Sequence, residues 1–208
     1  MEHLNKRLIV LGGPTAVGKT SLAIKLAQHY DTEILSCDSR QLYKELNIGV
    51  ARPSDEELAQ VKHHFIATKS IHDEYNAGMY AAEVDEVLNE LFKTKDLVIM
   101  TGGTGLYIKA SVEGLDVLPI RNEKLREQLE FIYKSEGLTA IQTIADKMDI
   151  NRSETDFENP QRLMRAIEIA EGGEAELVQT PKEKKYTTEF YYVNRNRAEL
   201  YERINHRV

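Results

Sequence analysis

Eight consecutive residues near the start of the chain combine the groups that bind a phosphate. They are Gly13, Pro14, Thr15, Ala16, Val17, Gly18, Lys19 and Thr20. The glycines let backbone N–H groups turn inward around an anion, Lys19 adds a positive charge, and the Thr20 hydroxyl can bind Mg²⁺. An apolar run at 8–11 precedes this phosphate loop. A helical pattern follows it, so the helix directs its positive end at the same anion. The pattern predicts a site for a di- or triphosphate and does not say which.

A carboxylate follows the second predicted strand. Phosphate-loop enzymes that hydrolyse nucleotides hold Mg²⁺ with an Asp at the far end of a buried strand. Here the strand at 97–100 runs into Thr101, and its only acid, Asp96, lies at the opposite end. Asp38 stands at a productive strand end instead, and this placement favours a general base close to a phosphate. Taken alone, Asp38 also fits the cap of a helix over 39–43, a role that is compatible with catalysis.

The elements that must position these groups alternate along the first 112 residues. Strands are predicted at 8–11, 33–36 and 97–100, and helices at 21–30 and 80–92. This alternation predicts an α/β fold with a parallel sheet and helices on both faces. Ligands in such folds bind beyond the carboxyl ends of the strands. We therefore expect the phosphate loop, residues 37–40 and residues 102–104 to converge on one site.

The second half of the chain changes character. Residues 121–149 are helical and amphipathic without strand signals, which is typical of a small helical insertion. Asn159 and Pro160 favour the start of a helix over 161–171. A strand is predicted at 187–193 and a further helix from 198 onward. We predict a core over 1–118, an insertion over 119–158, and a return to the core over 159–208.

Composition limits the classes of function. The net charge of −7 does not fit a protein that binds nucleic acid through bulk charge. Residues 181–208 carry seven Lys or Arg against four Glu, which fits either a local RNA-binding surface or a solvated face. A single cysteine, Cys37, fits a reducing cytoplasm. The chain shows no apolar run of membrane-spanning length and no signal peptide, so we expect a cytoplasmic protein that does not enter membranes.

Several motifs, in one order along nearly the whole chain, resemble the tRNA dimethylallyltransferases, also called tRNA isopentenyltransferases or the IPP transferase family. Cys-Asp-Ser-Arg-Gln-Leu-Tyr at 37–43 and Thr-Gly-Gly-Thr-Gly-Leu-Tyr-Ile-Lys-Ala at 101–110 are more specific than the phosphate loop. The remaining matches lie at 47–53, 63–65, 113–115, 159–166 and 197–204. The resemblance implies a P-loop NTPase-like parallel sheet with a small helical insertion. It also implies that the insertion, over 119–158, contacts tRNA.

The resemblance also implies a reaction. A dimethylallyl group would pass from dimethylallyl diphosphate to N6 of the adenine 3′ of the anticodon, in tRNAs that read codons starting with U. Asp38 would accept the amine proton, Thr104 would position the amine, and Thr15 and Arg203 would lie by the diphosphate. Lys19, the loop amides and Mg²⁺ near Thr20 would stabilise the leaving group. The adenine must flip out of the anticodon-loop stack to reach the carboxylate.

For binding of the tRNA anticodon stem-loop, the resemblance points to two segments and one further residue. They comprise Asp38, Ser39, Arg40, Gln41, Thr104, Gln161, Arg162, Leu163, Met164 and Arg165. Without the family, Arg162 and Arg165 also fit a pair of surface charges on one helix face. Such enzymes are expected to act as monomers. Relatives continue beyond residue 208 into further helices, so we expect this chain to be shorter than they are. A Thr-Gly-Lys-Pro-like turn of the relatives is replaced here by residues 171–175.

Three other functions share part of this pattern. An adenylate isopentenyltransferase would use the same loop and Asp38 with AMP, ADP or ATP as acceptor, whereas the helix at 161–165 and the insertion favour RNA. A phosphate-loop kinase of small molecules would need an Arg-rich lid, which the sequence does not offer. A nucleotide-dependent switch would need an acid after Met100. Tight binding of ATP or GTP would favour the last two functions, and a preference for dimethylallyl diphosphate would oppose them.

Overall fold

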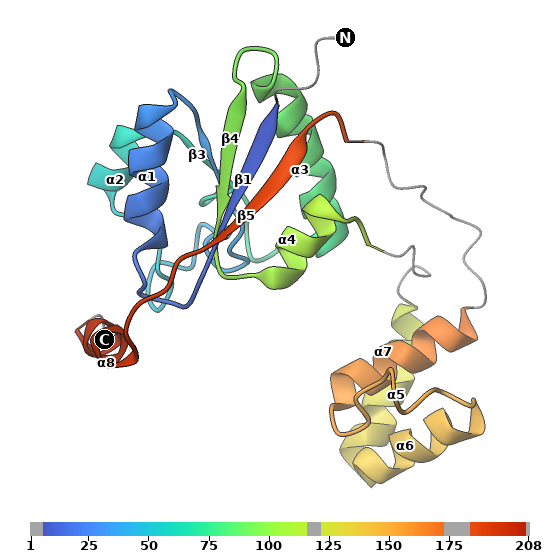
Figure 1. Cartoon of the computed structure of the whole chain (residues 1–208). Helices are drawn as coiled ribbons and strands as arrows, with labels where there is room; N and C mark the ends of the chain where they lie inside the picture. The colour runs from blue at the N-terminus through green and yellow to red at the C-terminus, as the bar shows by residue number, and fades with distance from the viewer. Residues whose placement is uncertain (1–5, 116–121, 173–183, 207–208) are drawn as a thin grey trace. The chain divides into compact units, whose positions relative to one another are not determined.

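The computed structural model describes residues 6–115, 122–172 and 184–206, and it contains two compact units (Figure 1). The first, here called the sheet unit, comprises Met1–Leu115 and Pro181–Val208. The second, here called the helical unit, comprises Asp116–Thr180. No helix among the described residues is long and apolar enough to cross a membrane.

The sheet unit is built on five parallel strands in the order β3-β2-β4-β1-β5. Their bounds are β1 Arg7–Gly12, β2 Ile34–Ser36, β3 His63–His64, β4 Leu97–Thr101 and β5 Thr187–Tyr192. Leu11 of β1 and Ser36 of β2 both pair with Thr101 of β4, so these three strands end at the same level. The predicted α/β fold with a parallel sheet is confirmed, and its carboxyl edge carries the polar segments.

Successive side chains of the central strands point to opposite faces of the sheet, and helices cover each face. Leu8 and Val10 of β1 pack into a cluster with α3 (Ala77–Leu91) and α4 (Gly105–Val112). Ile9 and Leu11 pack into a second cluster with α1 (Lys19–His29). Because both faces are covered, the central strands β1, β2 and β4 are mostly apolar, and all five residues of β4 are buried. Figure 1 shows α1 on one side of the sheet and α3 with α4 on the other.

Three short elements of the sheet unit are not anticipated by the sequence patterns. They are α2 (Asp55–Gln60), the two-residue strand β3, and α4, which directly follows the glycine-rich end of β4. Helix α2 begins with a capping box in which Ser54 and Glu57 satisfy each other's backbone N–H groups. The last element is α8 (Arg197–Asn205), in which no residue is buried.

The helical unit consists of α5 (Glu123–Glu136), α6 (Leu138–Lys147) and α7 (Pro160–Glu171). Gly137, at φ 81°, separates α5 from α6 in a backbone conformation that side chains disfavour. The three helices bury one apolar cluster: Leu129, Ile141, Ala145, Phe157, Leu163, Met164 and Ile167. The predicted return to the core at residue 159 therefore differs from the structure. Helix α7 packs within the helical unit, because its apolar face completes that unit's core.

Candidate active site

The phosphate loop joins β1 to α1 at the carboxyl edge of the sheet, and its backbone is unusual. The φ angles of Gly13, Ala16 and Gly18 are 145°, 61° and 104°. At Gly13 a Cβ would lie 2.4 Å from the carbonyl oxygen of Val193, so only glycine fits against the end of β5. Gly18 caps α1, whose first amides have no partner within the helix. Left-handed backbone of this kind turns successive N–H groups toward one point, which is the geometry that anion binding by this loop requires.

Three cationic side chains donate to the carbonyl oxygens of this loop. Lys19 Nζ lies 2.8 Å from Gly13 O and 2.9 Å from Pro14 O. Arg203 Nε on α8 lies 2.7 Å from Ala16 O, and Arg195 Nε lies 2.9 Å from Val17 O. Arg203 was expected near this loop from its motif, whereas Arg195 was not expected at any site. Figure 1 shows α8 at the same end of the sheet as the loop.

Asp38 follows β2 and is half-buried at the same edge. Its Oδ1 accepts hydrogen bonds from the backbone N–H groups of Arg40 (3.0 Å) and Gln41 (3.4 Å). The carboxylate therefore does cap a local segment, which is a turn and not the predicted helix over 39–43. Oδ2 faces β4, where a Cβ on Gly103 would lie 3.5 Å away. One oxygen is thus fixed by the backbone while the other is directed toward the end of β4.

Thr104 connects the end of β4 to the Asp38 segment. Its Oγ1 accepts a hydrogen bond from Ser39 N (2.9 Å) and donates to Ser39 Oγ (3.2 Å), and its own N–H donates to Cys37 O (3.0 Å). Thr104 also precedes α4 without capping it, because its hydroxyl is engaged by Ser39 instead. The predicted convergence of the segments after β2 and β4 is confirmed, and Thr104 lies beside Ser39.

Cys37 shows how close the charged groups of the site lie to one another. Burial, together with the negative charge of Asp38, raises the pKa of its thiol to about 12, while Lys19 acts in the opposite direction. Both charges therefore act on one sulfur atom between the phosphate loop and Asp38. Gly102 packs directly on this residue, since a Cβ there would lie 2.4 Å from the carbonyl carbon of Cys37.

The other predicted residues of the sheet unit differ in exposure. Thr15 and Arg40 are exposed, and Thr20 and Ser39 are half-buried. Gln41 is anchored on both sides of its amide: Nε2 donates to Ala51 O at 2.6 Å, and Oε1 accepts from Ser36 Oγ at 3.1 Å. Of the predicted RNA contacts in this unit, Arg40 is thus the exposed cation, whereas Gln41 is held within the fold.

The remaining predicted RNA contacts lie on α7 in the helical unit. Gln161 and Arg162 are exposed in its first turn. Arg126 of α5 donates to Gln161 Oε1 and, at 3.0 Å, to Glu168 Oε1. Arg165 donates to Glu168 Oε2 at 2.9 Å. The Glu168 side chain is 1% exposed, so a buried carboxylate bridges two arginines and fixes the helix face that carries Gln161 and Arg165.

Leu163 and Met164 do not fit a role in direct side-chain contact with RNA. Both are 0% exposed and belong to the apolar cluster of the helical unit. They follow Arg162 in the motif, but the helix turns them inward, away from the face of Gln161, Arg162 and Arg165. The structure therefore assigns them to packing and restricts side-chain contacts to the polar members of the segment.

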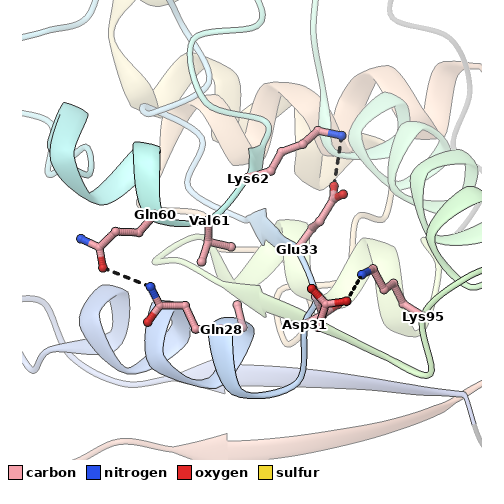
Figure 2. A pocket seen from close by; sticks show the side chains of 9 residues that line it. Gln28, Asp31, Glu33, Gln60, Val61, Lys62 and Lys95 are labelled. Atoms are coloured by element: carbon pink, nitrogen blue, oxygen red, sulfur yellow. Dashed lines mark hydrogen bonds and ion pairs between the residues drawn. The ribbon is translucent and has the colours of Figure 1, made fainter.

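A hollow of about 400 Å³ lies at the opposite, amino edge of the sheet, away from the loop (Figure 2). Its charged groups pair with one another: Lys62 Nζ lies 3.1 Å from Glu33 Oε2, and Lys95 Nζ lies 2.7 Å from Asp31 Oδ2. Gln28 and Gln60 bond across it at 3.4 Å. Because these groups satisfy each other and no strand-end motif reaches them, the candidate site remains at the carboxyl edge.

Comparisons with known proteins agree with this geometry. A family model described as IPP transferase matches residues 41–208. A tRNA dimethylallyltransferase of Flavobacterium psychrophilum is 41% identical over 97% of this chain and 69% of its own length. One of Cytophaga hutchinsonii is also 41% identical, over 100% of this chain and 70% of its own length.

Solved structures give the same answer. The full-length tRNA isopentenylpyrophosphate transferase of Bacillus halodurans has a TM-score of 0.60 and 28% identity, covering 98% of this chain. A eukaryotic dimethylallyltransferase acting on tRNA, 23% identical with a TM-score of 0.72, shows the fold alone. The chain spans 64% and 52% of these two structures, respectively. The fold, the family model and the identity over nearly the whole chain lead to one conclusion: the chain belongs to the IPP transferase family.

Proposed function

We propose that this protein is a prenyltransferase that transfers a dimethylallyl group from dimethylallyl diphosphate to N6 of an adenine in tRNA. The acceptor is the adenine 3′ of the anticodon in tRNAs that read codons starting with U. One observation carries the proposal: Asp38 is fixed through Oδ1 beside a phosphate loop, with Oδ2 directed toward the end of β4. Family membership supports the same reaction.

In the proposed step, the N6 amine attacks C1 of the dimethylallyl group. The N–C bond forms, the C1–O bond to diphosphate breaks, and the amine proton passes to Asp38. The adenine amine is a weak nucleophile because its lone pair is delocalised into the ring, so removal of the proton favours attack. Thr104, beside Ser39, orients the amine. Lys19 and the inward-facing loop amides stabilise the negative charge that develops on the diphosphate.

Mg²⁺ fits this site as a partner of the diphosphate. Among the described residues no group of three His, Cys, Asp or Glu could hold a metal. Mg²⁺ is usually bound by phosphate oxygens and water with few protein ligands. Thr20 is the residue that would supply a hydroxyl ligand here. When bound, the ion would neutralise charge on the leaving group. We propose that the protein acts as a monomer in the cytoplasm.

RNA recognition is assigned to the polar residues of both units. Asp38, Ser39, Arg40 and Gln41 lie on the segment beside the reacting amine, and Gln161, Arg162 and Arg165 lie on one face of α7. Asp38 is half-buried, so the adenine must leave the anticodon-loop stack to reach it. Unstacked loop bases are the usual targets of sequence-specific RNA recognition.

The test is transfer of label from radiolabelled dimethylallyl diphosphate, with Mg²⁺, to an unmodified tRNA whose anticodon ends in A. AMP and ATP serve as competing acceptors. This chain and a version extended to the length of its relatives are compared, each with Asp38→Asn. Asp31→Asn is the matched control, because Asp31 is an exposed Asp at the opposite edge of the sheet.

Loss of a general base costs about 10²- to 10⁴-fold in rate, so Asp38→Asn should lose nearly all transfer while Asp31→Asn keeps it. Label in AMP instead of tRNA would identify an adenylate isopentenyltransferase. ATP-dependent phosphorylation of a metabolite, without transfer to either acceptor by the folded extended protein, would overturn the proposal in favour of a kinase.

A further inference from the structure

Two arginines from the C-terminal part of the chain bind two successive peptides of the phosphate loop. Ala16 has φ 61° and Gly18 has φ 104°, so the loop has left-handed backbone on both sides of Val17. Arg203 Nε donates to the carbonyl of Ala16, in the Ala16–Val17 peptide, and Arg195 Nε donates to the carbonyl of Val17, in the Val17–Gly18 peptide. An unusual backbone conformation persists only when surrounding contacts over-determine it. These two hydrogen bonds are such contacts.

Arg195 contacts the phosphate loop as well as a neighbouring surface residue. Its Nη1 forms an ion pair with Glu199 of α8, four residues later, and this pair holds the guanidinium group. Its Nη2 lies 3.8 Å from the position that a Cβ would occupy on Gly18, the residue that precedes α1. An exposed ion pair between residues four apart has little effect by itself. The hydrogen bond to Val17, by contrast, joins residues 178 positions apart.

The direction of the loop carbonyls explains how the hydrogen bond from Arg195 to Val17 O affects the loop. A peptide whose oxygen is held outward by a cation presents its N–H on the other side. In the loop, the carbonyls of Gly13, Pro14, Ala16 and Val17 are all held by Lys19, Arg195 or Arg203. The amides between them are thereby directed inward as a nest for an anion.

We propose that Arg195 is a positioning residue for the diphosphate site, which holds the Val17–Gly18 peptide in its anion-binding conformation. The inference rests on the proposed function only in taking the phosphate loop as the diphosphate site. Without Arg195, the Val17–Gly18 peptide rotates and the N–H group of Gly18 turns away from the anion.

The first experiment measures binding of inorganic pyrophosphate, with Mg²⁺, to this chain by calorimetry. Arg195→Gln removes a charge-assisted hydrogen bond and should weaken binding about tenfold. Arg197→Gln is the matched control: Arg197 lies two residues away, and its Nε donates to Tyr201 Oη at 3.0 Å. The control should bind as the unaltered protein does. Equal affinity for both variants would overturn the inference.

A second substitution separates positioning from a direct charge contact. Arg195→Lys keeps the positive charge but has no donor at the position of Nε, so it should bind pyrophosphate about as weakly as Arg195→Gln. Full affinity of Arg195→Lys, with both variants folded by circular dichroism, would refute the positioning role and favour a direct charge contact. Lys19→Ala tests the site itself. Should Lys19→Ala still bind pyrophosphate normally, the proposed diphosphate site would be wrong. Should only Arg195→Gln bind normally, the inference alone would fail.

Discussion

The thiol of Cys37 is buried next to Asp38, and this environment makes it inert. Burial raises its pKa to about 12, with Asp38 contributing in the same direction. Only the thiolate is nucleophilic, and at pH 8 its fraction is on the order of 10⁻⁴ for such a pKa. We predict that iodoacetamide alkylates the native protein at pH 8 far more slowly than the urea-unfolded protein, as followed by mass spectrometry. The native rate should rise with pH toward 12. Equal native and unfolded rates would contradict the burial of this thiol at the site.

Gly102 is required by close packing. A Cβ on Gly102 would lie 2.4 Å from the carbonyl carbon of Cys37 and 2.8 Å from its Sγ. Backbone cannot yield cheaply, so Gly102→Ala should lower the free energy of unfolding by about 1–3 kcal/mol or more, as overpacked substitutions do. It should also reduce transfer, because the strands on either side carry Asp38 and Thr104. Urea denaturation measures the first effect.

Gly105→Ala is the control for this prediction. A Cβ on Gly105 meets nothing within 4 Å, and the residue begins α4. Alanine favours helix over glycine by up to about 1 kcal/mol, so this variant should be as stable as the unaltered protein or slightly more so. Two variants of equal stability would show that the contact between Gly102 and Cys37 is not limiting.

The sequence predicts individual residues of the site where a motif lies directly after a predicted strand. Asp38 and Thr104 stand next to predicted strands, and parallel strands bring their carboxyl ends together. Arg195 was not predictable, because its partner Val17 is 178 residues away and no local pattern marks the contact. The burial of Leu163 and Met164 was not predictable, because a linear motif does not distinguish the outward side chains of a helix from the inward ones.

A buried charge network joins α5 to α7 in addition to their shared apolar cluster. Arg126 and Glu168 lie 3.0 Å apart, and their side chains are 10% and 1% exposed. Removing one partner of a buried pair leaves an uncompensated charge and costs about 3–5 kcal/mol. Because Arg165 still pairs with Glu168, we predict a loss near the lower end for Arg126→Met, measured by urea denaturation.

Two further variants define this prediction. Arg126→Met combined with Glu168→Met replaces the pair by apolar side chains of similar length and should recover most of the loss. Arg162→Met is the control on the same helix, since its pair with Asp156 spans 3.4 Å and its side chain is 71% exposed. It should change stability by less than about 1 kcal/mol. A double variant as unstable as the single one would mean that the network acts through shape and not through charge.

Long elements with clear periodicity were predicted, whereas among the short ones β2 was predicted and β3, α2 and α4 were not. Strands β1, β4 and β5 and helices α1, α3 and α7 have the apolar spacing that burial on one or both faces requires. Strand β3 has two residues and α2 has six, too few for a period to be seen. The apolar face of α7 was recognised, but periodicity does not say which core receives it, so α7 was assigned to the sheet unit and not to the helical unit.

Charge is unevenly divided over the whole molecule. Residues 116–180 contain fourteen Asp or Glu against eight Lys or Arg, a net charge of −6 out of −7 for the chain. An acidic unit repels a phosphate backbone at long range. RNA binding must therefore depend on a few local cations, and Arg40, Arg162 and Arg165 are the cations within the proposed contacts.

This charge distribution predicts a weak dependence of RNA affinity on salt. Each phosphate neutralised on a single strand contributes about −0.7 to the slope of log K against log salt, so three contacts give a slope of about −2. Fluorescence anisotropy with a labelled anticodon stem-loop measures it. Arg162→Gln should reduce the slope by about 0.7, one phosphate contact. Arg152→Gln, which removes an exposed arginine paired with Asp146 in the same unit, should leave it unchanged. A slope steeper than about −5 would require a broad basic surface and would exclude recognition by these few residues.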